Sequence, residues 1–462
     1  MAQEMTYPAH VRATLTLGLP LIGSHLAQIA LHVTDTIMLG WYGVLPLAAV
    51  VLGASSFFVI YVLGSGFAKA VMPMVAAALG RGDEAQVRRD TRMGIWLSIA
   101  FGVISYPLFW FSGPILLALG QKPEVSAQAE SYMRIVGLGM MPALVVTVLQ
   151  SYLSALGRTQ VVLWATVAAV ALNAAVNWAL IFGNWGFPEL GVRGAALATI
   201  STQLLALVVL GLYAGLLPDL RRFALFQRFW RPDWQAMRQV FRLGWPIGLT
   251  GLAEGGLFQA TALMMGWVGT VELAAHGIAI EVTAVAFMAH VGLSSAATIR
   301  TAQFQGRGEA LALRRGAITA IAISLAAALA TILAFVLFPR QIIALFLDLA
   351  QPESAAIIAF GTSLLVVAAL FQLVDATQVM ALGLLRGLHD TQVPMWLASI
   401  SYWVIGIPMS YLLAFPLGLG GVGLWLGLVV GLACAGISLM IRFWRLAPKP
   451  VQAREPALQA GE

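Results

Sequence analysis

The chain has 462 residues, of which 60% are hydrophobic and 10% are charged, and its mean hydropathy is +0.88. This composition excludes an ordinary soluble domain, because the apolar runs exceed what a soluble core needs. The net charge of +6 comes from arginines in short patches between apolar runs, which argues against a nucleic-acid-binding face. The single cysteine, Cys434, excludes a disulfide framework and a cysteine-based metal site.

Twelve apolar segments of membrane-spanning length are separated by polar or Gly/Pro-rich stretches. They predict an all-α membrane protein whose twelve transmembrane helices run through residues 14–40, 47–78, 92–119, 127–156, 160–183, 191–216, 239–268, 274–302, 315–347, 354–386, 393–417 and 420–446.

Basic residues are concentrated in alternate loops. If the N-terminus is cytoplasmic, the outside loops hold only Lys122, Arg193 and Arg340. The positive-inside rule then predicts that both termini are cytoplasmic and that the number of spans is even. The expected location is the bacterial inner membrane. No removable signal peptide is expected. The inside loops hold Arg81, Arg88, Arg89, Arg92, Arg158, Arg221, Arg222, Arg228, Arg231, Arg238, Arg300, Arg307, Arg314, Arg315 and Arg386.

The second half of the chain repeats the first. A shift of 226 positions aligns the stretch from Leu17 to Ala49 with the stretch from Leu243 to Ala275 without gaps, and it also aligns Gly80 with Gly306. Six spans per half is an even number, so the two halves have the same orientation. The repeat therefore predicts two six-helix lobes related by a pseudo-two-fold axis along the membrane normal.

This duplication divides the chain into an N-terminal lobe (1–216), a cytoplasmic linker (217–238), a C-terminal lobe (239–446) and a cytoplasmic tail (447–462). The linker is basic and aromatic, with the sequence RRFALFQRFWRPDW. It is either a partner-binding segment or, as we favour, a surface segment whose arginines meet anionic lipid and whose aromatic rings lie at the membrane interface.

Four acids lie deep within the expected spans: Asp35, Glu254, Glu281 and Asp375. A charged group near the bilayer centre costs roughly 2.5–3.5 kcal/mol even on the lenient insertion scale, so each is a candidate functional residue. Carboxylates that crowd one another must share protons or cations. Glu254, Asp375 and Glu281 of the C-terminal half therefore predict a coupling-ion site, although helix-end acids facing water or structural acids paired with a base remain alternatives.

Asp35 of the N-terminal half has polar companions on other spans. Asn173 and Asn177 are four residues apart, which places both amides on one helix face, and Thr199 is on the following span. One carboxylate with amide and hydroxyl oxygens suits a hard monovalent cation or a hydrogen-bonded proton and does not suit zinc. Intramembrane asparagines also join helices by hydrogen bonds, so that role stays open.

The intramembrane histidines, His25, His32, His276 and His290, are interpreted as satisfied core or interfacial residues, with a proton relay as the alternative.

Several motifs around these residues resemble the multidrug and toxic compound extrusion (MATE) transporters of the NorM-like branch, and the resemblance covers essentially the whole chain. The motifs are VTDTIMLGWYG around Asp35, ALGRTQ, NAAVNWALIFG with FPELGVRGAALAT, LAEGGLF around Glu254, and FQLVDATQVMALGLLRGLHDTQVP around Asp375.

The resemblance implies two six-helix lobes around a V-shaped cavity and export of cationic amphiphilic compounds in exchange for Na⁺ or H⁺. It implies that Glu254 and Asp375 form a C-terminal-lobe cation site and that Asp35, Asn173, Asn177 and Thr199 form an N-terminal-lobe site. Two positions depart from the family pattern. Phe371 stands where an aromatic hydroxyl is expected, and Glu281 stands where similar proteins have a neutral polar residue.

The expected function is thus a cation-coupled multidrug antiporter that has cationic organic molecules and membrane lipids as partners, acts as a monomer and needs no cofactor beyond the coupling ion. One alternative is a lipid-linked oligosaccharide flippase of the same superfamily, which would need cavity arginines where this inventory is acidic. The other is an intramembrane transferase, for which the chain lacks a paired-aspartate or other catalytic motif. Without a P-loop, ATP is not expected to be the direct energy source.

Overall fold

The computed structural model describes residues 5–347 and 353–449, so most of the expected tail lies outside the described residues. Its N-terminal half contains α1 (Tyr7–Tyr42), α2 (Val44–Arg81), α3 (Glu84–Trp110), α4 (Ser112–Ala118), α5 (Pro123–Val136), α6 (Met140–Ala155), α7 (Thr159–Phe182) and α8 (Val192–Leu216). A short helix, α9 (Pro218–Arg221), follows. The C-terminal half contains α10 (Trp234–Val268), α11 (Thr270–Arg307), α12 (Ala310–Leu337), α13 (Pro339–Ala344), α14 (Ser354–Gly387), α15 (Gln392–Ser399), α16 (Ile407–Ala414) and α17 (Gly420–Leu446).

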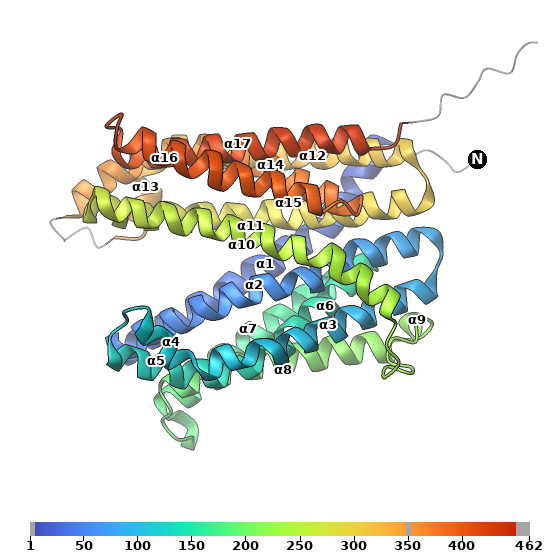
Figure 1. Ribbon diagram of the computed structural model, residues 1–462, viewed down its shortest axis with the longest axis horizontal. Helices are drawn as coiled ribbons and strands as arrows, with labels where there is room; N and C mark the ends of the chain where they lie inside the picture. The colour runs from blue at the N-terminus through green and yellow to red at the C-terminus, as the bar shows by residue number, and fades with distance from the viewer. Residues whose placement is uncertain (1–4, 348–352, 450–462) are drawn as a thin grey trace, which may run out of the picture.

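The described chain is built from helices that run between the same two ends of the molecule (Figure 1). Eleven helical segments of the described residues are long and apolar enough to cross a membrane. α10 is the twelfth long segment. Its 35 residues include Glu254 and six glycines, which lower its hydropathy. The protein is therefore an all-helical, multi-pass membrane protein.

Several spans are interrupted where the sequence predicted continuous helices. The third span breaks at Phe111 between α3 and α4, and the ninth breaks at Phe338 between α12 and α13. A 3₁₀ turn, Gly137–Gly139, joins α5 to α6. A π-helical stretch, Ile400–Gly406, separates α15 from α16. Such π segments are frequent at functional sites, and this one contains a residue of the C-terminal-lobe site.

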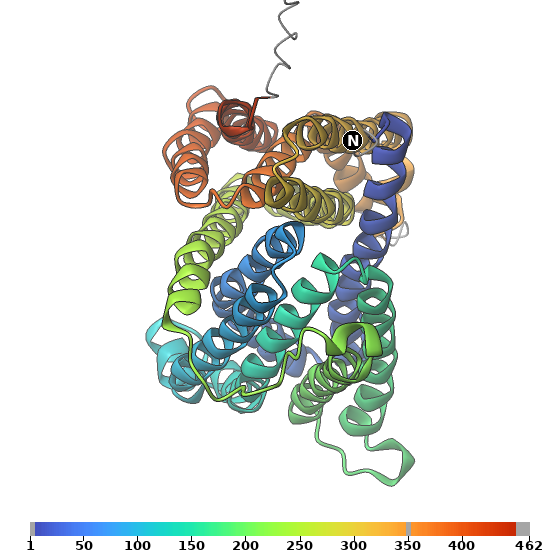
Figure 2. The same cartoon turned by 90° about the vertical axis from the view of Figure 1, so that its right-hand side faces the viewer.

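Two bundles lie side by side, separated at one end and joined at the other (Figures 1 and 2). α1 begins beside the C-terminal half, where it packs on α11 and α12, and continues into the N-terminal half, where it packs on α7. At the joined end, the N-terminal hydrophobic core extends into α10 and α11 through Val240, Ile247, Ile299 and Ala302.

The two halves approach closely where α2 crosses α11. A Cβ added to Gly80 would collide with the carbonyl oxygen of Gln303, and one added to Gly306 would collide with the carbonyl oxygen of Ala77. Gly80 and Gly306 are partners in the 226-residue repeat, as are Ala77 and Gln303. The contact is therefore reciprocal, as a pseudo-two-fold axis through the crossing requires.

The linker packs against the N-terminal bundle. Phe223 is fully buried, and the indole of Trp96 donates a hydrogen bond to the carbonyl of Phe229 at 3.0 Å. Trp230 and Trp234 are exposed. α10 begins at Trp234, earlier than expected, because Asp233 caps it by accepting the Ala236 amide at 3.0 Å.

Candidate functional site

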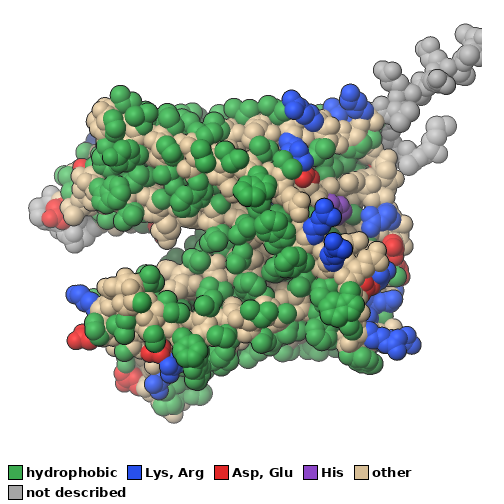
Figure 3. Space-filling view, viewed as in Figure 1, with side chains coloured by type: hydrophobic (Ala, Val, Ile, Leu, Met, Phe, Trp, Pro, Cys, Tyr) green, Lys and Arg blue, Asp and Glu red, His purple; other side chains and the backbone are tan. Residues whose placement is uncertain are grey.

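A deep cleft separates the two halves at the end of the molecule opposite the arginine-rich end (Figure 3). α1 and α2 of the first half pack on α10 and α11 of the second toward the joined end, and these contacts close the cleft below. The candidate site residues lie on the helices that surround this space.

The joined end is tied by polar contacts between the halves as well as by the glycine crossing. Buried Arg300 of α11 donates to the carbonyl of His10 and to the Thr14 hydroxyl, both at 2.5 Å, on α1. His389, in the turn after α14, hydrogen-bonds the backbone of Pro73 in α2, and burial lowers the pKa of its imidazole. Both ties must open if the cleft is to open at this end.

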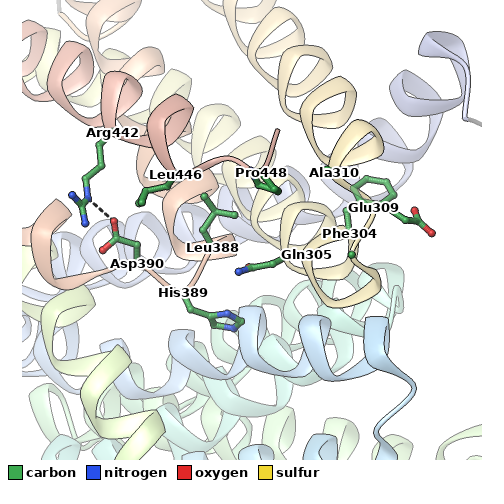
Figure 4. A pocket seen from close by; sticks show the side chains of 11 residues that line it. Phe304, Gln305, Glu309, Ala310, Leu388, His389, Asp390, Arg442, Leu446 and Pro448 are labelled. Atoms are coloured by element: carbon green, nitrogen blue, oxygen red, sulfur yellow. Dashed lines mark hydrogen bonds and ion pairs between the residues drawn. The ribbon is translucent and has the colours of Figure 1, made fainter. Parts of the chain in front are cut away.

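A separate pocket of about 590 Å³ lies at the joined end, where α11, α12, the α14–α15 turn and α17 meet (Figure 4). Arg442 donates to Asp390 there at 2.5 Å, and His389 lines the same space. Asp375 and Glu254 do not line it. The pocket is thus distinct from the carboxylate sites.

The N-terminal-lobe residues predicted from the sequence meet at one site. The Asn177 amide donates to Asp35 at 2.5 Å and also to the Asn173 side-chain oxygen at 3.0 Å. The Asn173 amide nitrogen is buried near Asp35 and has no hydrogen-bond partner among the described residues. Both asparagines are fully buried. Their spacing of four brings them together on α7, facing α1.

Tyr132 of α5 is a further member of this site that the sequence analysis missed. Its hydroxyl hydrogen-bonds Thr199 of α8, and its ring lies within electrostatic reach of Asp35. Tyr132 links Thr199 to the carboxylate, so the site draws on α1, α5, α7 and α8. The Asn177 side-chain oxygen is buried without a partner among the described residues, which leaves an acceptor for a cation or a proton.

The C-terminal-lobe site is built on α10, α14 and the π-helical stretch after α15. The Gln378 amide donates to the Tyr402 hydroxyl at 2.6 Å and lies 3.4 Å from the Glu254 carboxylate. Gln378 and Tyr402 are fully buried. One amide therefore bridges the carboxylate to a phenol.

Asp375, one turn before Gln378 on α14, is fully buried and lies within electrostatic reach of Glu254. Neither of its carboxylate oxygens has a hydrogen-bond partner in the described part of the chain. A buried charge without a partner is strongly unfavourable, so this carboxylate needs a proton or a cation. Of the described carboxylates at the two sites, Asp375 is the one that most needs a bound proton or cation.

Phe371 packs edge-on against Phe258 and Trp425, with ring centroids 6.0 and 5.6 Å away. It contributes no hydroxyl to Asp375, as its sequence predicts. Tyr402 instead supplies a hydroxyl near both carboxylates. The sequence signal for Tyr402 was weak because it is one of several aromatic residues in an apolar span.

Glu281 of α11 differs from the other C-terminal-lobe acids because its residue is exposed. It is eleven residues from Gly292, close to three helical turns, so the two share a face of α11. Gly292 contacts Ile22 of α1. Glu281 therefore faces the α1 side of the cleft and does not join the group of Glu254, Asp375 and Tyr402.

The histidines separate into two kinds. His276 accepts from the Trp425 indole at 3.1 Å, as a satisfied core residue does. His290 is buried and pairs with Ser324 at 3.2 Å through Nδ1, but its Nε2 has no hydrogen-bond partner among the described residues, so it is satisfied only in part. His25 hydrogen-bonds Gln28 on α1, and His32 is exposed on that helix. His25, His32 and Asp35 are spaced by seven and three residues, so they line one face of α1.

Two basic side chains act on Glu254: Lys69 of α2 and Arg386 of α14. The sequence analysis assigned Arg386 to a cytoplasmic loop and treated the cavity inventory as acidic. The charged residues near Glu254 are instead of both signs. Arg386 is among them because α14 continues to Gly387 and a long arginine side chain reaches back along its helix.

A MatE family model matches residues 20–179 and 246–412. The probable multidrug resistance protein NorM of Rhizobium meliloti is 47% identical over 443 residues, covering 96% of this chain and 95% of the relative. Its namesake in Agrobacterium fabrum is 43% identical over 444 residues, covering 96% of each.

Solved structures show the same fold. The eukaryotic MATE transporter AtDTX14 superimposes with a TM-score of 0.83 at 21% identity, covering 96% of this chain and 97% of that one. A multidrug resistance MATE family transporter of the MOP superfamily, in an outward-facing conformation, gives a TM-score of 0.84 at 21% identity, covering 94% and 95%.

Proposed function

The chain belongs to the MatE family and is a multidrug efflux transporter, and on that premise we propose that it exports cationic amphiphilic compounds in exchange for Na⁺ or H⁺. The coupling cation binds between Glu254 and Asp375 in this proposal. Asp35, Asn173, Asn177 and Thr199 form a second cation or proton site in the N-terminal lobe.

The observation that carries the proposal is the unpartnered, fully buried carboxylate of Asp375 beside Glu254. Two carboxylates in a low-dielectric site repel each other unless a proton or a cation lies between them. Occupancy by that ion therefore changes the relative energies of the arrangements of α10, α14 and the π-helical stretch.

Antiport follows from reciprocal linkage. A drug cation and the coupling ion compete for the same negative potential, so binding of the ion lowers the affinity for the drug and binding of the drug lowers the affinity for the ion. A coupling free energy of about 1–3 kcal/mol corresponds to a change in affinity of about 5- to 150-fold.

The transport direction depends on the orientation of the chain. The arginine-rich end, which carries the start of α1 and the α8–α10 linker, is cytoplasmic in this proposal, and the protein lies in the bacterial inner membrane as a monomer (Figures 1 and 3). The cleft then faces outward. A cysteine placed at exposed Gln227 should be labelled by an impermeant reagent only after the cells are opened. Labelling in intact cells would show that the chain has the opposite orientation.

Dye efflux from membrane vesicles tests the exchange itself. The Na⁺ gradient and the pH gradient are imposed separately on vesicles loaded with a cationic dye. Efflux that accelerates with one gradient and is absent from vesicles lacking the protein supports antiport and identifies the ion. Efflux indifferent to both gradients would refute ion coupling.

A further inference from the structure

Lys69 lies on the face of α2 that packs against α10. Val62, Gly66 and Lys69 are spaced by four and three residues and share one face. A Cβ on Gly66 would collide with the backbone of Gly244 and Gly248, and one on Gly251 would lie 2.9 Å from Val62. Because later residues of α2 meet earlier residues of α10, the two helices are antiparallel. Glu254 is three residues beyond Gly251, on the α2 side of α10.

The two side chains lean toward each other, which brings their charges within electrostatic reach. Side chains on a helix lean toward its N-terminus, so Lys69 leans along α2 toward the open end, whereas Glu254 leans along antiparallel α10 toward the joined end. Their charges interact. Lys69 is an exposed residue although its neighbours Ala68 and Ala70 are fully buried. Its side chain therefore reaches into the floor of the cleft.

The other charged groups around Lys69 come from different helices. Arg386 of α14 acts on both Lys69 and Glu254. His25 of α1 faces Lys69 and bonds Gln28. Among these groups Glu254 is the only anion, so the Lys69 ammonium and a mobile cation both gain from the same carboxylate.

We propose that Lys69 is a tethered counter-ion of Glu254: its ammonium occupies the negative potential of the carboxylate when the cleft is empty and competes with incoming drug cations and with the coupling ion. The proposal rests on the proposed function, since it assumes that Glu254 receives those cations. A lysine suits this role because its ammonium is a point charge on a flexible four-carbon stem and can be displaced without breaking a fixed bidentate geometry.

The tethered ammonium has two consequences. Together with Arg386, it offsets the charge of Glu254 between transport steps. It also limits the affinity of the site for drug cations, because each arriving cation must displace an ammonium that cannot diffuse away. A drug that is bound less tightly is released more readily to the outside.

Binding of tetraphenylphosphonium to the purified full-length protein tests the proposal. The dissociation constant is measured across a pH series for wild type, Lys69→Gln and Lys69→Arg, with Arg158→Gln as a matched control that removes a cation from the joined end, where Arg158 pairs with Asp219. Lys69→Gln should bind the probe about 10-fold more tightly where Glu254 is ionised. Its pH midpoint should move upward, because removing a neighbouring cation favours the protonated carboxyl. Lys69→Arg keeps the charge and should bind the probe no more tightly than wild type, and the control should resemble wild type.

A double-mutant cycle separates this role from a general field effect. In a Glu254→Gln background, Lys69→Gln should produce no further gain in affinity. Unchanged or weaker binding by Lys69→Gln at every pH, or a gain that persists without Glu254, would overturn the proposal. A wild-type protein that binds no tetraphenylphosphonium would instead refute the proposed function, and the two failures are distinguishable.

Discussion

The buried carboxylates of the two lobes are stabilised in different ways. Asp35 in the N-terminal lobe accepts from the Asn177 amide at 2.5 Å, and Thr199 and Tyr132 close the site. Asp375 in the C-terminal lobe has no hydrogen-bond partner within the described residues. The first carboxylate is held by neutral donors, whereas the second depends on whatever ion or proton arrives.

This difference arose within a tandem repeat. Gly80 and Gly306 kept the same reciprocal contact at the crossing of α2 and α11. The acids did not keep their positions, because Asp35 aligns with Thr261 and Glu254 aligns with Gln28. The comparison teaches that the inter-lobe crossing stayed symmetric while the chemistry of the cleft became asymmetric. On the proposed function, we expect the larger coupling energy in the C-terminal lobe.

The largest effect is expected for Asp375→Asn. The amide matches the carboxyl in shape but carries no negative charge and takes up no proton, so it binds the coupling ion more weakly and gradient-driven dye efflux should fall by up to about 150-fold. Asp390→Asn is the control, because it removes an acid near the joined end that pairs with Arg442. Vesicle efflux at matched protein levels measures both variants. Normal efflux in folded Asp375→Asn protein would contradict the proposed difference between the lobes.

A smaller effect is expected for Asp35→Asn. The new side-chain oxygen can still accept from Asn177, so the local hydrogen bonds survive and the loss of efflux should be about 5-fold, at the low end of coupling effects. The same vesicle measurement applies. A loss as deep as that of Asp375→Asn would show that the two lobes contribute equally.

Glu281→Gln should change ion preference while leaving efflux measurable. Glu281 faces the α1 side of the cleft and lies outside the cluster of Glu254 and Asp375, so it modifies the field without holding the ion. The pH optimum or the ratio of Na⁺-driven to pH-driven efflux is measured against wild type. A folded variant with no efflux under either gradient would place Glu281 among the essential ligands.

The smallest effect is expected at Asp233, where the linker ends and α10 begins. Asp233→Ala removes the cap of α10 and the contact with Arg89, at a cost of about 1 kcal/mol. The Arg89 guanidinium lowers the pKa of Asp233 from its ordinary 3.8. This stabilisation is therefore complete above about pH 4 and is lost as the pH falls through the lower folded value. Thermal unfolding at pH 7 and below pH 4 measures it. An equal difference between variant and wild type at both pH values would contradict the linkage.

The sequence predicted the helices well where apolar runs were long. It did not predict the breaks at Phe111 and around Tyr402, because a run of apolar residues looks the same whether its helix is continuous or interrupted. It placed the start of α10 too late, since the Asp233 cap depends on local geometry.

The site was predictable where spacing carries information. Asn173 and Asn177 were found because four residues make one helical turn. Tyr132 was missed because its role depends on how α5 packs beside α8, and Arg386 was missed because a long side chain reaches away from its own backbone position.

The central claim is that the coupling cation binds between Glu254 and Asp375. Its most direct test is ion-triggered release of a pre-bound fluorescent cation from purified wild type, Glu254→Gln, Asp375→Asn and Asp35→Asn protein. The account predicts release from wild type and from Asp35→Asn, with both C-terminal-lobe variants requiring about 5- to 150-fold more ion. Release from both C-terminal-lobe variants at the wild-type ion concentration would contradict the account and move the coupling site to Asp35, Asn173, Asn177 and Thr199.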